Sequence, residues 1–183
     1  MKLADLSTLM ERRRGGLSLE GFCTDPMIAS LRWPDDVVEQ FLYDHGDNAH
    51  FLRDYRDIDF SRVVWDLEAT TADELSKMPT GASDNGCIEE YAANPDHWVA
   101  VRRTGVHEGV ARCWETLGTW KRSPILIDRR LLDPSESGLQ VVEGRTRVGV
   151  LRGRRRQGSL VAVHHEAWVG RPSMPAASSR DES

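Results

Sequence analysis

Apolar residues recur at helical spacing in several stretches of the chain. One stretch begins at Asp35 or Asp36, both suitable N-caps, and ends at His45-Gly46. Another begins near Asn48, and a third runs through residues 106 to 117. These stretches predict amphipathic helices that pack one face against a core.

Short apolar runs with β-branched residues predict the strands. Four runs have this character, at residues 63 to 65, 98 to 101, 140 to 142 and 160 to 163. Thr71 is followed three residues later by Glu74, the spacing of a capping box, which predicts a helix after the first strand. We therefore expect an α+β fold, with a small mixed sheet of about four or five strands and helices around it.

Composition along the chain predicts three segments. Residues 1 to 59 are expected to form a helical N-terminal extension, of which residues 1 to 33 are a loosely ordered lead-in. Residues 60 to 170 are expected to form the α+β domain. Residues 171 to 183 are rich in Pro, Ser and Ala, a composition that favours a disordered tail.

The strand predicted at residues 140 to 142 runs directly into a glycine and two arginines. Glu143-Gly144-Arg145 is expected to be a tight turn from this strand into an arginine-rich helix. The N–H groups at the start of a helix bind anions, and Arg145 and Arg147 could add planar charged groups. Glu143 is then the nearby carboxylate able to hold a metal ion or take a proton.

The turn Glu143-Gly144-Arg145-Thr146-Arg147 resembles the signature turn of the ParB/sulfiredoxin-like superfamily, which has variants such as G-E-R-R, D-G-H-H-R and G-G-C-H-R. Residues 120 to 128, WKRSPILID, are similar to the family's Pro-Ile-x-Val strand after a helix. Residues 64 to 68 and 71 to 75 are similar to its first strand and following helix start. The resemblance covers residues 60 to 170 and implies a ParB/sulfiredoxin-like fold.

The resemblance also implies which chemistry to expect. Sulfiredoxin needs a cysteine in the turn, and this turn has none, so sulfinic-acid repair is not expected. We also expect no helix-turn-helix domain after the turn. The closest variant, D-G-H-H-R, belongs to small-molecule kinases. It implies phosphate binding by Gly144, Arg145, Thr146 and Arg147, catalysis or metal binding by Glu143, and a second carboxylate from Glu68.

Overall composition is ordinary for a protein with a core. Hydrophobic residues make up 39% of the chain and charged residues 29%, and no apolar stretch approaches the length of a membrane helix. We expect no membrane partner and a cytoplasmic location. The three cysteines are widely separated and include no C-x-x-C pair, which argues against a structural zinc site or a disulfide framework.

Charge is distributed unevenly. Residues 1 to 120 contain 12 Lys or Arg and 22 Asp or Glu, whereas residues 121 to 183 contain 12 and 7. The leading hypothesis is a nucleotide-binding protein that hydrolyses a nucleoside triphosphate or transfers its phosphoryl group with Mg²⁺. The first alternative is a non-enzymatic interaction module, whose acidic N-terminal half, including Asp54, Asp57 and Asp59, meets a partner. The second is nucleic-acid binding through the C-terminal arginines.

Overall fold

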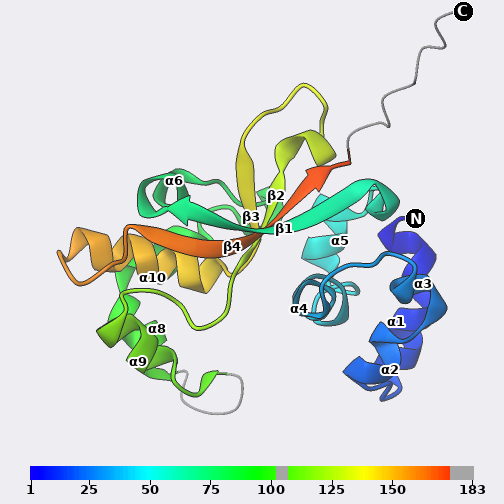
Figure 1. The fold of residues 1–183 in the computed structure, drawn as a ribbon, viewed down its shortest axis with the longest axis horizontal. Helices are drawn as coiled ribbons and strands as arrows, with labels where there is room; N and C mark the ends of the chain where they lie inside the picture. Colours follow the sequence, from blue (N-terminus) through cyan, green and yellow to red (C-terminus); the bar gives the residue numbers. More distant parts are fainter. Residues whose placement is uncertain (102–106, 174–183) are drawn as a thin grey trace, which may run out of the picture.

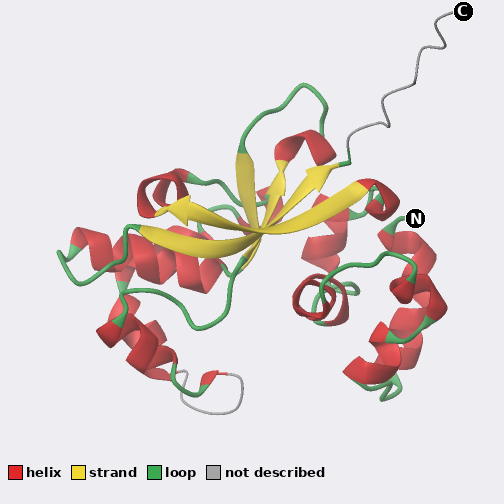
Figure 2. Ribbon diagram, viewed as in Figure 1, coloured by secondary structure: helices red, strands yellow, loops and turns green. Residues whose placement is uncertain are grey.

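Four strands form one mixed sheet between two groups of helices (Figures 1 and 2). This computed structural model describes residues 1–101 and 107–173. The strands lie in the order β1-β4-β2-β3, and their bounds are β1 Val63–Thr71, β2 Ile125–Asp128, β3 Leu139–Glu143 and β4 His164–Pro172. The α+β class and the mixed sheet predicted from the sequence are confirmed.

Strand pairing places the end of β3 at one edge of the sheet. Strand β4 pairs antiparallel with β1 and parallel with β2, and β2 pairs antiparallel with β3. Glu143 lies opposite Ile125, which lies opposite Trp168, which in turn lies opposite Leu67. The β3–α10 turn and strand β1 are therefore separated by the full width of the sheet.

The N-terminal helices cover one face of the sheet. Their bounds are η1 Leu3–Leu6, α1 Ser7–Arg14, α2 Leu19–Cys23, α3 Pro26–Ala29, α4 Asp35–Val37, the π-helix η2 Val38–Tyr43, α5 Ala49–Tyr55 and η3 Phe60–Arg62. Leu6, Phe22 and Phe41 pack in one core with Trp65 and Ile125 of the sheet. Residues 1 to 33 thus contain helices that contribute to the core, and the expectation of a loosely ordered lead-in was wrong.

The later helices cover the opposite face. Their bounds are α6 Ala72–Lys77, η4 Ala82–Asp84, α7 Cys87–Ala93, α8 Pro95–Val101, α9 Val110–Thr116 and α10 Arg145–Arg156, and a short helix η6 Arg129–Leu131 follows β2. Thr71 and Glu74 form the predicted capping box of α6. Leu126, Ala167 and Val169 point to this second face, whereas Ile125 points to the first. Because successive side chains of a strand alternate between its faces, the strands contribute to both cores.

Two predicted strands were misplaced. Residues 98 to 101 belong to helix α8, because Pro95 starts the helix and lies on the same buried face as Val99, four residues later. Residues 160 to 163 precede β4, whose alternating buried residues begin only at His165.

The last two corrections concern the ends of predicted segments. The helix predicted for residues 106 to 117 is α9, and Val106 lies outside the described residues. Arg171 and Pro172, expected in the tail, belong to β4, and residues 174 to 183 lie outside the described residues. Within the described ranges, no helix combines the length and apolar character needed to cross a membrane.

Candidate functional site at the β3–α10 turn

The predicted strand-to-helix turn is present at Gly144. Strand β3 ends at Glu143 and α10 begins at Arg145, and Gly144 has a φ of 92°. A Cβ atom on Gly144 would collide with the Cβ of Pro124 and lie 3.1 Å from its Cα. Glycine is required here both for the left-handed backbone and for the close approach of Pro124.

Arg147 holds three segments of the chain together. Its guanidinium donates to the carbonyl oxygens of Arg122 at 2.9 Å and Ser123 at 3.3 Å, and to the Oε1 atom of Gln40 at 2.8 Å. It also forms an ion pair with Glu143, four residues earlier at the end of β3. A phosphate at this position has to compete with these partners for the guanidinium.

Glu143 is held in its ionised form by its surroundings. Burial raises the pKa of its carboxyl, but the charge of Arg147, the His45 ring and the Gly144 N–H outweigh burial and lower the pKa to about 2. The Nε2 atom of His45 lies 3.9 Å from the Oε1 atom of Glu143. A carboxylate with so low a pKa is a weak base near neutral pH.

The other residues of the predicted site are split between two places. Thr146 and Gly144 line a pocket together with Glu143 and Arg147. Arg145, by contrast, forms an ion pair with Asp84 of η4 and does not line this pocket.

Glu68 is not brought to the turn. It lies on β1, the opposite edge strand, and its carboxylate accepts two hydrogen bonds from Arg171 at 2.8 and 3.0 Å. Three strand spacings, roughly 14 Å in all, separate the two edge strands. Glu143 and Glu68 therefore do not form a carboxylate pair.

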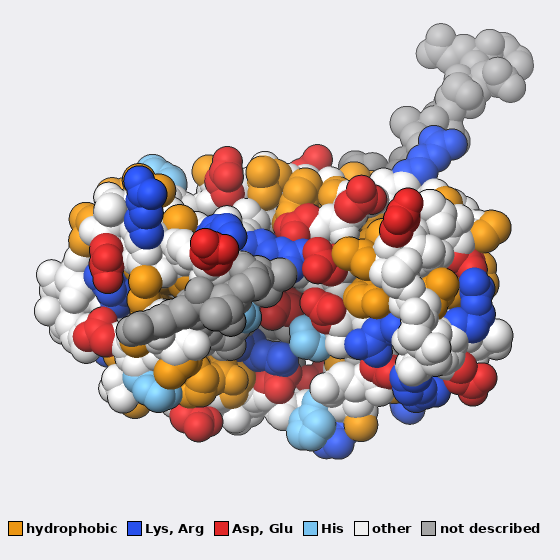
Figure 3. Space-filling view, turned by 90° about the horizontal axis from the view of Figure 1, so that it is seen from below, with side chains coloured by type: hydrophobic (Ala, Val, Ile, Leu, Met, Phe, Trp, Pro, Cys, Tyr) orange, Lys and Arg blue, Asp and Glu red, His pale blue; other side chains and the backbone are white. Residues whose placement is uncertain are grey.

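The pocket at the turn has a volume of about 230 Å³ and lies between the two helical groups. Seen from below, acidic, basic and histidine side chains gather in the middle of this face (Figure 3). One part of the lining is aromatic, formed by Trp98, Trp114 and Trp120, and the ring centroids of Trp114 and Trp120 are 6.2 Å apart. The rest of the lining is mostly polar, formed by Gln40, Asp44, His107, Lys121, Arg122, Glu143, Gly144, Thr146 and Arg147.

Most charges of the pocket are already paired. Arg122 binds Asp36, with 2.6 Å between Nε and Oδ1, and also Glu39. Within residues 1–101 and 107–173, neither Lys121 nor Asp44 forms an ion pair. Lys121 is thus the cation, and Asp44 the anion, that the pocket can offer to a ligand.

The pocket residues that sequence reasoning missed include Gln40, Asp44, Lys121 and Arg122. Gln40 is 2% exposed, and its amide donates to Asp36 and to the Ser123 carbonyl. The signal in the sequence was a glutamine among the apolar residues of a predicted helix, because an amide that becomes buried there needs hydrogen-bond partners.

The residues present do not build a magnesium site by themselves. Over the described part of the chain, no group of three or more His, Cys, Asp or Glu side chains could hold a metal ion. The carboxylate of Glu143 faces Arg147 and His45, which occupy it with hydrogen-bond donors. The prediction that Glu143 binds a metal therefore has no support from its geometry.

Internal ion pairs neutralise much of the charge asymmetry of the sequence. The arginines near the end of α10 pair with acidic residues of the earlier helices, as Arg152–Glu89, Arg154–Asp96, Arg155–Asp73 and Arg156–Glu89. Asp54 accepts from Ser83, and Asp59 accepts from the N-terminal amine and Ser61. The ion pairs offset part of the positive charge of α10, on which the nucleic-acid alternative depended, whereas Ser83 is neutral and leaves the charge of Asp54 in place.

Comparisons of this chain with protein-family models, curated proteins and solved structures found no match.

Proposed function

We propose that the pocket at the β3–α10 turn binds a nucleoside triphosphate and supports its hydrolysis or phosphoryl transfer. The observation that carries the proposal is the division of the lining into an aromatic part and a polar part beside a helix N-terminus. A base can stack on indole rings, while phosphates favour the N–H groups and cations at the other part.

Within this proposal, Lys121 and the start of α10 bind the phosphates, and Trp98 contacts the base. Glu143 positions Arg147, so its role is electrostatic rather than that of a metal ligand. Mg²⁺ stays a prediction as the counter-ion that a triphosphate carries in solution. The ParB/sulfiredoxin-like resemblance belongs to the same proposal, and the glycine turn between β3 and α10 supports it.

Thermal shift and titration calorimetry with ATP, CTP, GTP and ADP, with and without Mg²⁺, test this proposal. We expect at least one triphosphate to bind the wild-type protein. Lys121→Ala should weaken that binding at least about 10-fold and leave stability nearly unchanged, because an exposed, unpaired lysine adds little to the fold.

Lys77→Ala is the matched control for this variant. Lys77 is also exposed, but it lies at the end of α6 and does not line the pocket. Its replacement removes the same charge and should leave nucleotide affinity at the wild-type value. Equal affinity in wild type, Lys121→Ala and Lys77→Ala would exclude Lys121 from the site, and no binding of any nucleotide by wild type would refute the proposal.

A further inference from the structure

Two carboxylates line the pocket, and their surroundings differ sharply. Glu143 is bound by Arg147 and lies beside His45, so its oxygens are occupied. Asp44 lines the same pocket from the N-terminal helical group, and within the described residues no ion pair or hydrogen bond occupies its carboxylate. A group that takes a proton from a ligand needs a free, accessible oxygen, and of the two only Asp44 has one.

The π-helix η2 places Asp44 at the rim of the pocket. Asp44 directly follows Tyr43, the last residue of η2, and its backbone N–H donates to the Glu39 carbonyl at 2.9 Å, the i to i+5 bond of a π-helix. The wider turn is anchored by Gln40, which is buried against Arg147 and Ser123. The position of Asp44 is thus tied to the β3–α10 turn through Gln40, and the neighbouring His45 lies beside Glu143 of the turn.

Several charges surround Asp44. Glu39 and His45 lie on its own segment, and Arg122 and Glu143 face it across the pocket, which Lys121 also lines. Burial raises the pKa of Asp44, with Glu39 and Glu143 adding to the rise and His45 and Arg122 opposing it. The shift makes Asp44 a stronger base than Glu143, whose pKa is lowered to about 2.

We infer that Asp44 is the general base of this pocket and takes a proton from the water that attacks the terminal phosphorus of a bound nucleoside triphosphate. This inference rests on the proposed function. The water oxygen forms a bond to the γ-phosphorus, and the bond from that phosphorus to the bridging oxygen breaks with its electron pair. The nucleoside diphosphate leaves, the water proton moves to Asp44, and inorganic phosphate is released.

The experiment measures phosphate release and nucleotide affinity for wild type, Asp44→Asn and Asp57→Asn with ATP, CTP and GTP and Mg²⁺. Asparagine keeps the shape of the side chain but loses its basicity, so Asp44→Asn should lower kcat at least about 100-fold while affinity stays within about threefold. It should also abolish the fall of kcat on the acidic side of the pH profile. Asp57 is exposed and lies outside the pocket, so Asp57→Asn should behave like wild type.

Each outcome separates this inference from the proposal beneath it. Wild type that binds no nucleotide refutes both. Wild type that binds and turns over nucleotide while Asp44→Asn retains kcat and its acidic limb overturns Asp44 as the base and leaves the proposed function standing. If wild type binds a nucleotide but does not hydrolyse it, the inference that Asp44 is a general base is also refuted. Loss of nucleotide affinity in Asp44→Asn would make Asp44 a binding residue instead.

Discussion

Arg147 and Glu143 lie four residues apart across the β3–α10 turn, and each compensates the charge of the other. An arginine read from the sequence as a phosphate ligand is also a structural cross-link, because it ties η2, the 122–123 segment and β3 to the start of α10. Its carboxylate partner has a lowered pKa, and that shift links the ion pair to stability.

Glu143→Gln should lower the free energy of unfolding by about 3 kcal/mol at pH 7, because the folded-state pKa of Glu143 is about 2 and its ordinary value is 4.5. The sign follows from the lowered pKa. The ionised carboxylate stabilises the fold above pH 4.5, and this contribution is lost as the pH falls from 4.5 through 2. Urea unfolding measures the difference in free energy of unfolding between wild type and variant. This difference at about pH 3 should be less than half of its value at about pH 7. An equal difference at both values would show that the charge of Glu143 is not the cause.

At the scale of elements, the β3–α10 connection depends on one glycine. Gly144 adopts a left-handed backbone and also lets Pro124, just before β2, pack against the turn. The hydrogen bond from the Val148 N–H to the Gly144 carbonyl, at 3.0 Å, begins the helix directly at this point. A side chain at Gly144 therefore disturbs the turn, the adjacent strand and the pocket together.

Gly144→Ala should cost at least about 2 kcal/mol of stability, because strain from a positive φ adds to the collision with Pro124. Gly158→Ala is the matched control. Gly158 has a φ of 70°, but a Cβ atom added to it would meet nothing within 4 Å, so only the backbone strain of about 1 kcal/mol applies. Thermal unfolding of both variants measures the difference, and equal losses would show that contact with Pro124 is unimportant.

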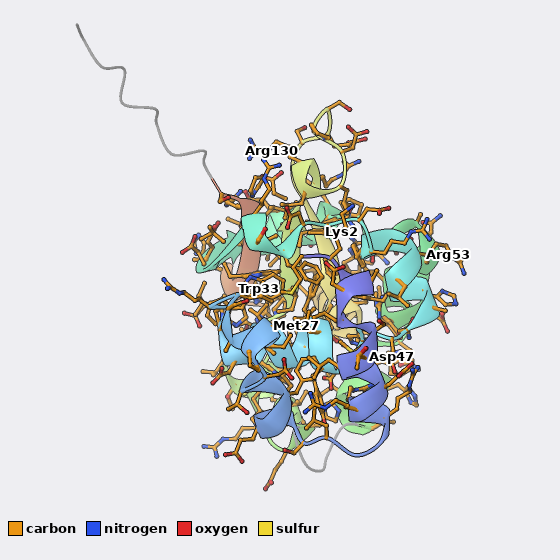
Figure 4. The ribbon with its side chains drawn as sticks, turned by 90° about the vertical axis from the view of Figure 1, so that its right-hand side faces the viewer. Lys2, Met27, Trp33, Asp47, Arg53 and Arg130 are labelled. Atoms are coloured by element: carbon orange, nitrogen blue, oxygen red, sulfur yellow. The ribbon has the colours of Figure 1, made fainter. Side chains whose placement is uncertain are left out.

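At the scale of the whole molecule, the N-terminal helices and the sheet share a core. Trp33 contacts Phe41, Phe60 and Trp65 edge to face, with centroid separations of 5.1 to 5.7 Å. Figure 4 views the molecule from the N-terminal side and shows Trp33 among the N-terminal helices. It also shows Asp47 near α1, where Asp47 pairs with Arg13. The N-terminal helices are thus part of the folding unit that builds the pocket.

Leu6→Ala tests this integration. Leu6 is fully buried in the core shared with the sheet, so its truncation should cost about 2 to 5 kcal/mol. Leu67→Ala removes the same atoms from a side chain that is 46% exposed on β1 and should cost much less. Urea denaturation followed by tryptophan fluorescence and by circular dichroism should give one coincident transition in both variants. Two separate transitions would show that the N-terminal helices unfold independently of the sheet.

Much of the local structure could be predicted from the sequence, because its causes are local. The Thr71–Glu74 capping box and the turn at Gly144 depend on residues close to one another in the chain. The α+β class follows likewise from the periods of the apolar residues. The helix α8 was predicted as a strand because Trp98 to Val101 is a short apolar run, for which periodicity alone does not separate helix from strand.

The tertiary structure decided which residues form the site. Gln40, Asp44 and Lys121 reach the β3–α10 turn from distant segments of the chain, and nothing in their local sequence indicates that they meet. Glu68 follows a strand-like run, as the predicted second carboxylate should, but strand order puts β1 at the far edge of the sheet. The sequence by itself determined the turn and its charges, because these follow from neighbouring residues. Which charges are neutralised, and which stay available to a ligand, was decided by the packing of distant segments.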